Sequence, residues 1–492
     1  MKKTFDDQKI SAIYLKLEKV DSSLIPHLSS LRTPVHVVYG GANLFKAETP
    51  GKLGNIALKS LETYAPNFAE FARAMWISGA DTLPIYEEAV QEIEFQLIEN
   101  EAKVKTENFS AWLAWTIFNR THEKLRNEPI EDFRIDFEDG YGFRTDAEED
   151  SHCISASNEL AKLSCQSSVV SRQSEIRNSN FGFLPFCGFR IKSFAPETYK
   201  RAVRTFDLFL TNLLEKCDGK LPEHFVVTLP KITRKEEVEI LAELLAEFER
   251  ANNLENDAIK IEIMIETPQS IINERGEIAL KSLVEAGNGR VNSAHFGAFD
   301  YTANFGISGI HQHLNHEACN FARQMMQISL APLHIRLSDS VTTEMPVAVH
   351  KGENLNTKQL KENVRAVHKA WRTHFNNVTN SQINGFYQSW DLHPAQLVAR
   401  YAAVYAFFLE SSDVQGKRLK GFIDKATQAN MTGNTFDDAA SAQGLLNFFT
   451  RALNCGAINE TEILEATSLT ANQLKSASFA KIMKGKSKKF FK

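Results

Sequence analysis

The stretch from Lys260 to Glu266, which reads LysIleGluIleMetIleGlu, decides the fold class of this chain. Side chains alternate across a β-strand, so the three isoleucines share one face, and Glu262, Met264 and Glu266 share the other. A strand with one apolar and one charged face fits two structures. It is either half-exposed in an antiparallel sheet, or it is buried in a parallel barrel whose interior carries charge.

The stretches around this strand favour the barrel. Other short β-rich runs begin at Thr33, Asp132, Pro185, His224, Asn292, Leu333 and Ile383. Helical patterns fill most of the gaps, for example over 197–214, 235–250, 270–286, 357–375 and 394–409. A strand followed by a helix, repeated along the chain, is typical of parallel strands that are covered on both faces. The sequence therefore predicts an α/β fold, a (β/α)8 TIM barrel.

Additional segments surround this minimal barrel. We predict three parts: an N-terminal helical segment over 1–32, the barrel over 33–411, and a helical C-terminal extension over 412–492. A helical insertion over about 46–130 follows the first strand, with helices near 52–63, 86–104 and 108–127. A Ser/Asn-rich stretch over 164–180 predicts a loop. The chain ends in the basic tail LysGlyLysSerLysLysPhePheLys, which we interpret as a solvated terminus.

Composition and charge exclude several classes of function. The 492 residues include 56 Lys+Arg and 61 Asp+Glu, for a formal charge of −5, so we expect neither nucleic-acid nor membrane binding. The longest uncharged apolar run, 401–409, is far shorter than the roughly 20 residues that span a bilayer. The six cysteines include no CxxC pair, and no signal-peptide pattern opens the chain. These features predict a cytoplasmic protein without disulfides or a zinc site.

Charged residues gather where the predicted strands end, which is where barrel enzymes carry their sites. In chain order they are Glu138, Asp139, Arg190, Lys192, Lys231, Glu266, Asp300, Asp339, Asp391 and His393, with Ser338 among them. Buried charges are costly unless they are paired or bound to a metal, so a charged barrel interior predicts a site. Carboxylates without cysteine suit Mg²⁺ or Mn²⁺, and the cationic side chains suit an anionic substrate.

Five short motifs at these strand ends occur in one order. They are PheGluAsp (137–139), LeuProLys (229–231), IleGluThrPro (265–268), PheGlyAlaPheAsp (296–300) and LeuHisProAlaGln (392–396). With these motifs the chain resembles the citrate lyase β-subunit-like (HpcH/HpaI aldolase) family of the pyruvate/phosphoenolpyruvate barrel superfamily. The resemblance covers most of 130–410 and the first predicted strand. The insertion and the C-terminal extension make the chain a larger offshoot of that family.

The resemblance implies roles for the charged residues. Glu266 and Asp300 would be the two protein ligands of Mg²⁺, and Arg190 would be a catalytic residue that binds a substrate carboxylate or carbonyl oxygen. Glu138 and Asp139 match the acidic pair that lies near the metal, and we predict a catalytic role for both. A structural ion pair between this acidic pair and Arg190 remains an alternative.

Two further residues are predicted to bind substrate. Lys231 matches a lysine near the barrel mouth, although a structural ion pair explains it almost as well. His393 starts a helix in HisPro, where a capping or packing role is as plausible as a catalytic one, and Asp391 is similar. The cluster of His311, His313 and His316 has the wrong spacing for one helix face, so a loop role is preferred over metal binding.

By resemblance, the predicted function is a Mg²⁺-dependent carbon–carbon lyase or aldolase that acts through a metal-stabilised enolate of a 2-oxo acid of the pyruvate, oxaloacetate or glyoxylate type. Malate synthase-like acyl transfer, phosphoenolpyruvate chemistry and a non-catalytic ligand-binding barrel stay open as alternatives. A coenzyme A thioester substrate is not assumed, because PheGluAspGlyTyrGly (137–142) departs from the family pattern. The expected partners are a small oxo acid and, on the resemblance alone, further copies in a homo-oligomer.

Overall fold

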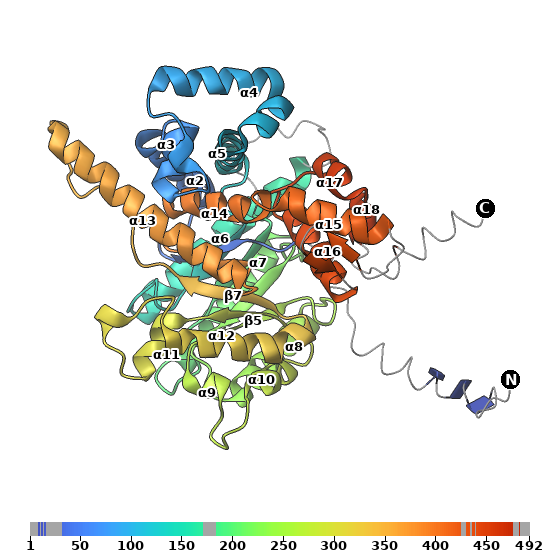
Figure 1. The fold of residues 1–492 in the computed structure, drawn as a ribbon. Helices are drawn as coiled ribbons and strands as arrows, with labels where there is room; N and C mark the ends of the chain where they lie inside the picture. The colour runs from blue at the N-terminus through green and yellow to red at the C-terminus, as the bar shows by residue number, and fades with distance from the viewer. Residues whose placement is uncertain are drawn as a thin grey trace. The chain divides into compact units, whose positions relative to one another are not determined.

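A computed structural model of the chain contains a closed barrel of eight parallel strands (Figure 1). The strands are β1 (His36–Gly41), β2 (Asp132–Asp136), β3 (Phe186–Arg190), β4 (Phe225–Leu229), β5 (Lys260–Ile265), β6 (Val291–Phe296), β7 (Arg336–Val341) and β8 (Gln388–Asp391). They pair in chain order, and β1 closes the barrel against β8, where His36 is in register with Ser389. The predicted (β/α)8 TIM barrel is confirmed, and the antiparallel alternative is wrong.

The structure describes residues 32–170, 184–424, 430–432, 435–437 and 439–475, with the single positions 8, 9, 11, 12, 14, 15 and 482. The barrel helices are α6 (Asp146–Val170), α7 (Tyr199–Lys216), α8 (Lys235–Ala251), α9 (Pro268–Ile271), α10 (Leu280–Ala286), α11 (Ala298–Asn304), α12 (Glu317–Leu330), α13 (Thr357–Ile383) and α14 (Gln396–Leu409). No helix within the described residues combines the length and apolar character that crossing a bilayer requires.

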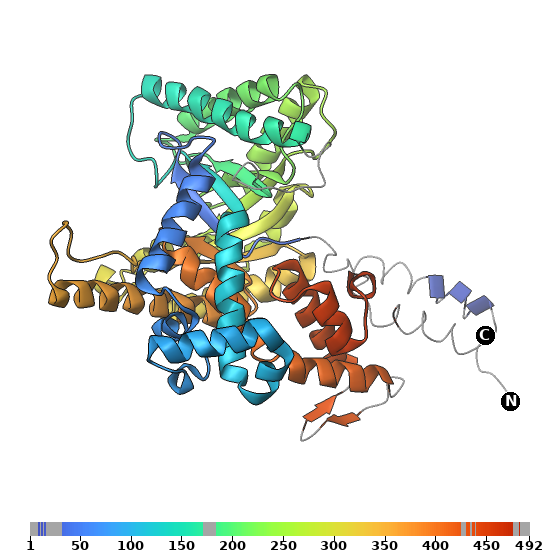
Figure 2. The same ribbon diagram turned by 90° about the horizontal axis from the view of Figure 1, so that it is seen from above.

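The helical insertion lies between β1 and β2. It consists of α2 (Thr49–Tyr64), α3 (Phe68–Met75), the 3-10 turn η1 (Ala80–Thr82), α4 (Glu87–Glu107) and α5 (Phe109–Asn127). These helices gather on one side of the barrel, while α8, α9, α10, α11 and α12 lie on the opposite side (Figures 1 and 2). The long α13 extends well beyond the strands (Figure 1).

The chain divides into two compact units, of which Pro34–Glu410 is the barrel with its insertion. The described part of the other unit contains α15 (Ser412–Asp424), a hairpin of β9 (Asn430–Thr432) and β10 (Thr435–Asp437), α16 (Ala439–Asn454), α17 (Glu460–Thr467) and α18 (Ala471–Lys475). The antiparallel hairpin was not predicted for this helical extension. Most of the predicted N-terminal segment lies outside the described residues, and the basic tail lies wholly outside them.

Alternation along the strands sorts the side chains as predicted. The three isoleucines of β5 are fully buried on its outer face, and Phe189 of β3 stacks at 4.3 Å between ring centroids on Phe209 of α7. The inner face of β5 carries Glu262, which is also fully buried and bonded to side chains from several other strands. Directional hydrogen bonds therefore fill the lumen where many barrels have apolar packing.

Several predicted boundaries are wrong. The strand predicted from Leu333 begins at Arg336 instead, because His334 adopts a left-handed backbone with φ +60° after the 3-10 turn η3 (Ala331–Leu333). The strand predicted from Ile383 begins at Gln388, because α13 continues to Ile383. The single helix predicted over 270–286 is two helices, α9 and α10, and α6 extends to Val170 where a loop was predicted. The rest of that predicted loop up to 180 lies outside the described residues.

Candidate metal and substrate site

Two carboxyl groups meet at the carboxyl ends of β5 and β6. Glu266 follows β5 and is 1% exposed, and half-buried Asp300 lies in the first turn of α11, directly after β6. Their side chains lie close enough for each to shift the pKa of the other, and Glu266 Oε1 accepts a hydrogen bond from the backbone N–H of Lys231 at 2.7 Å. Burial and the charge of Asp300 raise the pKa of Glu266 to about 8. Ionising both groups at once would therefore create negative charge that the protein compensates poorly.

Gly297 is the residue that lets these two carboxyl groups approach. A Cβ atom at this position would lie 2.5 Å from both Cβ and Oε2 of Glu266. Such a contact is closer than any real Cβ atom tolerates, so a side chain here would displace the carboxylate. The glycine that begins the GlyAlaPheAsp turn thus has a steric reason to be there.

Arg190 is held at the end of β3 by a buried partner that the sequence reasoning did not identify. Its Nε and Nη2 donate to the two carboxylate oxygens of Asp136 at 2.7 and 2.6 Å. Asp136 stands in register with Arg190 on the neighbouring strand β2. The third nitrogen, Nη1, lies 3.4 Å from Glu138 and 3.7 Å from Asp139. A bidentate clamp on one side leaves Nη1 as the donor that is directed to the barrel mouth.

The acidic pair after β2 is bridged by Lys231. The Lys231 ammonium forms ion pairs with both Glu138 and Asp139, the latter at 2.8 Å. Burial raises the pKa of Glu138 to about 7, and Arg190 opposes this effect. Burial also acts to raise the pKa of Asp139. The hydrogen bond to Glu138 and the positive charges of Arg190 and Lys231 outweigh burial and lower this pKa. The raised pKa of Glu138 and the lowered pKa of Asp139 describe one proton that resides mainly on Glu138 and is shared with Asp139.

Lys231 itself has an unusual backbone. Its φ is +52°, a left-handed conformation that favours glycine. This conformation allows one residue to bind both halves of the site, because its N–H reaches Glu266 while its side chain reaches the acidic pair. Backbone strain of this kind persists where surrounding contacts hold it, often at functional sites.

The residues at this mouth fit a divalent cation. Five carboxyl groups face two cationic side chains, and both cations are engaged elsewhere, Arg190 by Asp136 and Lys231 by the acidic pair. Within the described residues neither Glu266 nor Asp300 takes part in a salt bridge, because the two cations are paired with other carboxylates. No cluster of three or more His, Cys, Asp or Glu side chains in this part of the chain is arranged around a metal position, so the protein would supply two ligands here. A site with two carboxylates suits Mg²⁺, which keeps waters or substrate oxygens in its remaining positions.

Other residues at the predicted strand ends lie away from this mouth. Lys192 turns to Glu149 of α6, at 3.1 Å, and Asp339 forms a buried ion pair with Arg323 at 3.0 Å. His393 Nδ1 accepts a hydrogen bond from the backbone N–H of Ala395 at 3.2 Å, in the turn that precedes α14. The structure thus brings Glu138, Asp139, Arg190, Lys231, Glu266 and Asp300 together and leaves His393 apart from them.

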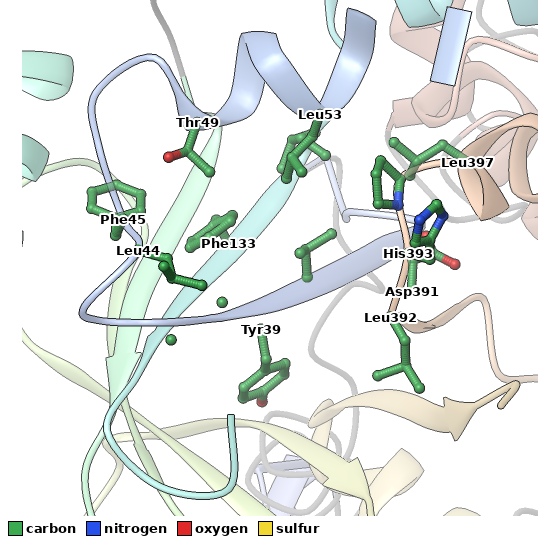
Figure 3. A pocket seen from close by; sticks show the side chains of 15 residues that line it. Tyr39, Leu44, Phe45, Thr49, Leu53, Phe133, Asp391, Leu392, His393 and Leu397 are labelled. Atoms are coloured by element: carbon green, nitrogen blue, oxygen red, sulfur yellow. The ribbon is translucent and has the colours of Figure 1, made fainter. Parts of the chain in front are cut away.

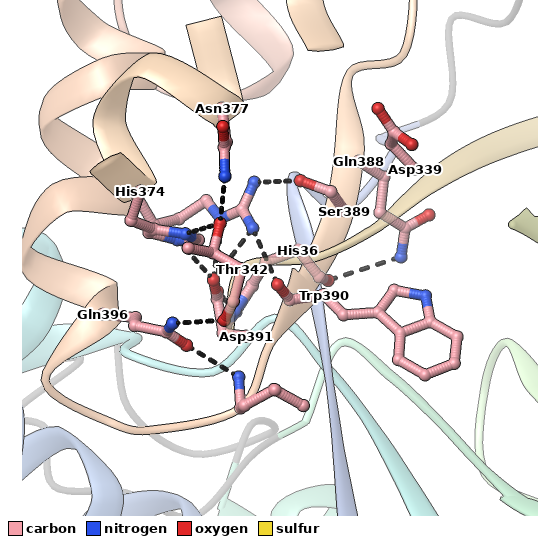
Figure 4. Close-up of polar contacts among 12 residues, drawn as sticks. His36, Asp339, Thr342, His374, Asn377, Gln388, Ser389, Trp390, Asp391 and Gln396 are labelled. Carbon is pink, nitrogen blue, oxygen red and sulfur yellow. Dashed lines mark hydrogen bonds and ion pairs between the residues drawn. The ribbon is translucent and has the colours of Figure 1, made fainter. Parts of the chain in front are cut away.

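Asp391 is the centre of a buried network outside the lumen (Figure 4). Its carboxylate lies 2.8 Å from nitrogens of His36, His374 and Arg400. Burial alone would raise the pKa of Asp391, but the charge of Arg400 and the histidine hydrogen bonds hold it well below its usual range. These contacts support the structural interpretation of Asp391 that the sequence left open beside a catalytic one.

A cavity of about 210 Å³ lies next to this network, between β1, β2 and the starts of α2 and α14. Leu53, Phe133 and Leu397 supply an apolar lining, and His393 stands at one side (Figure 3). Tyr39 lies on the other side of the β1 ribbon from Leu53 and Phe133, because alternate residues of this strand face opposite ways (Figure 3). The cavity is thus on the outer wall of the barrel, separate from the carboxylates of the lumen.

Tyr39 and Trp390 were not among the predicted site residues. Tyr39 lies between Trp390, whose ring stacks on it at 4.3 Å, and the guanidinium of Arg190, which lies 4.8 Å from its ring. The available signal was strand alternation, which places Tyr39 with Gly41 and Trp390 with Gln388 on the inner faces of β1 and β8. Only closure of the barrel brings the two strands, far apart in sequence, into contact.

The fold and the site define a (β/α)8-barrel protein with an acidic, arginine-containing site at the carboxyl ends of its strands. The chain belongs to the family described as domain of unknown function DUF6986, whose model matches residues 17–482. No curated protein sequence matches the chain.

Among solved structures, the chain is similar to a citrate lyase from Burkholderia xenovorans, with 16% identity, a TM-score of 0.48, and coverage of 68% of this chain and 87% of that one. It is also similar to CitE from Mycobacterium tuberculosis in complex with magnesium, acetoacetate and coenzyme A, with 14% identity, a TM-score of 0.41, and coverage of 67% and 91%. A malate synthase from Haloferax volcanii has 13% identity, a TM-score of 0.39, and coverage of 66% and 80%. These likenesses are distant, so the fold assignment rests on the barrel topology itself.

Proposed function

We propose that the protein is a Mg²⁺-dependent carbon–carbon lyase or aldolase that acts on a 2-oxo acid. The observation that carries the proposal is the meeting of buried Glu266 and half-buried Asp300 beside Arg190, where both carboxyl groups have raised pKa values. The motif resemblance to the citrate lyase β-subunit-like family supports the same reaction class. Uncompensated carboxylates of this kind are costly in a structural role and useful as ligands of a cation.

The residues would divide the work as follows. Bound between Glu266 and Asp300, Mg²⁺ or Mn²⁺ would supply Lewis-acid stabilisation of the negative charge that develops on the 2-oxo oxygen during carbon–carbon bond cleavage. Arg190, fixed by Asp136, binds the substrate carboxylate through Nη1. Its position is preorganised, so little reorganisation accompanies the reaction.

The acidic pair holds the proton that the reaction needs. Glu138 has a pKa of about 7, so at neutral pH it is present in both protonation states, as an effective general acid or base requires. Lys231 keeps Glu138 and Asp139 in place and balances part of their charge. Glu138 would therefore move a proton to or from the substrate while Asp139 remains ionised.

Calorimetric titration with oxalate, a planar mimic of an oxo-acid enolate, tests the proposal. We expect the wild-type protein to bind oxalate only when Mg²⁺ is present, and Glu266→Ala and Asp300→Ala to abolish that binding. Glu239→Gln, on the exposed face of α8, is the matched control and should bind normally. Oxalate binding that is independent of Mg²⁺, or that survives in both alanine variants, would remove the site assignment. Release of pyruvate from candidate oxo acids then identifies the substrate.

A further inference from the structure

Two exposed helices of the barrel unit each carry charge of one sign, and the first of them is α4 of the insertion. It lies outside α3 and α5 (Figure 1), with Val90 and Leu97 on its buried face. Its opposite, exposed face carries the acidic stripe Glu88, Glu92 and Glu99. Intervals of four and seven residues keep these carboxylates on one helix face, and all three precede the kink at Asn100. Phe95 lies between them on the same face and is 57% exposed.

Helix α13 carries the opposite charge on its exposed face. Its first half extends beyond the strands of the barrel (Figure 1). Val367 and Trp371 are fully buried, and the face turned away from them carries the basic stripe Lys358, Arg365 and Lys369. All three cationic residues are exposed. Intervals of seven and four residues again keep the charges on one face of the helix.

Neither stripe is neutralised within its own chain. Among the described residues, the only ion pair that the two stripes form is that of Lys358 with Glu362, at 4.0 Å. On α8, by contrast, exposed carboxylates pair with cations of the same helix, Glu239 with Lys235 at 3.1 Å and Glu247 with Arg250 at 2.6 Å. Like charges on one face destabilise a helix, so both stripes gain when a surface of opposite charge covers them.

The two stripes match each other in length and in spacing. In each, the first and last charges are eleven positions apart, about 16 Å along a helix. The intervals run in opposite order on α4 and α13, so an antiparallel packing of the two helices brings every charge to its opposite: Glu99 to Lys358, Glu92 to Arg365 and Glu88 to Lys369. A parallel packing would place Glu92 against Glu362 instead. The antiparallel order also sets Glu99 beside the first turn of α13, where the helix dipole attracts an anion.

We propose that a second copy of this chain covers both stripes, with α4 of one protomer packed antiparallel on α13 of its partner. A two-fold axis repeats the contact, so the three ion pairs form twice in one closed dimer. The exposed ring of Phe95 then lies at the centre of each contact, where aromatic side chains are common in interfaces. Because α4 belongs to the insertion, dimerisation would depend on a segment outside the barrel itself, and the inference does not rest on the proposed function.

Charge reversal tests the dimer by light scattering after size-exclusion chromatography. At micromolar concentration and low salt, the wild type should have a mass near twice the 55.4 kDa of one chain. One variant replaces the acidic stripe by lysines, and the other replaces the basic stripe by glutamates. Each alone should be monomeric, with a dimer dissociation constant raised about a hundredfold or more, because like charges then face each other. Mixed in equal amounts, the two variants should form a heterodimer, since each reversed helix meets an unreversed helix of the same original charge.

The matched control makes the same change of charge elsewhere, with lysine at the exposed Glu236, Glu243 and Glu255, and should remain dimeric. If a triple variant fails to fold, the single reversals Glu92→Lys and Arg365→Glu replace it in the same mixing experiment. Salt of about 1 M should weaken the wild-type dimer, because it screens charges beyond about 3 Å. A monomeric wild type overturns the inference, also where its basic stripe binds heparin as a probe of nucleic acid. So does a dimer that survives both reversals, or a mixture that forms no heterodimer.

Discussion

Replacing Glu266 by glutamine should stabilise the metal-free protein while it abolishes Mg²⁺ binding. The pKa of this buried group is raised from 4.5 to about 8, which corresponds to at most about 5 kcal/mol of unfavourable free energy for the ionised folded state, at 1.36 kcal/mol per pKa unit. An amide of the same shape can still accept from the Lys231 N–H and can donate to Asp300. We therefore expect a gain of a few kcal/mol in the free energy of unfolding.

The sign of the pH dependence follows from the same shift. A carboxyl group with a raised pKa binds its proton more tightly when folded, so wild-type stability falls as pH rises from about 4.5 to about 8. The advantage of Glu266→Gln should thus be absent near pH 4 and complete above about pH 8. With Mg²⁺ added at pH 8.5, the wild type should gain melting temperature and the variant should not, because only the wild type binds the ion.

Glu262→Gln provides the matched control on the same strand. Glu262 is equally buried, but the charges and hydrogen bonds of Arg134 and His295 together outweigh the effect of burial and hold its pKa well below the usual range. The Glu262→Gln substitution should lower the free energy of unfolding by about 3–5 kcal/mol, because the buried guanidinium of Arg134 loses a charged partner. Urea denaturation of both variants in EDTA at pH 8.5 measures the contrast. If Glu266→Gln were destabilised as much as Glu262→Gln, the reasoning on uncompensated charge would be refuted.

Three more changes give separate tests. Gly297→Ala should weaken Mg²⁺ binding by about tenfold or more in calorimetry, because the new methyl group displaces the Glu266 carboxylate; unchanged affinity would contradict the steric role. Asp391→Asn should cost about 3–5 kcal/mol in urea denaturation near pH 7, since Arg400 loses its buried partner. That deficit should shrink as pH falls below about 4, through the depressed pKa of Asp391, and a pH-independent deficit would argue against it. Tyr39→Phe should lower stability by about 1–3 kcal/mol in the same assay, because the buried groups beneath lose a hydrogen-bond partner; a neutral effect would show that water replaces the hydroxyl.

The barrel could be predicted because its signals are local. Alternation in Lys260–Ile265 and long helical connections both depend on nearby residues only, and the structure has that strand with the predicted bounds. The strand predicted from Leu333 was placed three residues too early, because 333–337 alternates as a strand does. The left-handed backbone of His334 delays the strand until Arg336. Alternation alone does not reveal where a backbone turn interrupts it.

The site could be predicted only in part, because its chemistry depends on contacts between strands. Motif order pointed to Glu266 and Asp300, and the structure places them together. The clamp of Asp136 on Arg190 depends on the register of β2 with β3, which no local pattern reveals. Substrate binding by His393 remains a prediction, because its ring accepts a hydrogen bond from the backbone of Ala395 and no contact joins it to the acidic site. The cytoplasmic location and homo-oligomeric state also stay predictions.

Closure of the barrel by its first and last strands also sets the timing of folding during synthesis. His36 of β1 and its partner Asp391, at the end of β8, lie 355 positions apart in the chain. At a synthesis rate of roughly 5–20 residues per second, β1 waits roughly 20–70 s for β8 to leave the ribosome. Throughout that interval one edge of β1 has no strand to pair with, and unpaired edges are sites of aggregation. The nascent chain is therefore a natural client for chaperones that shield strand edges, and slower translation would lengthen its exposure.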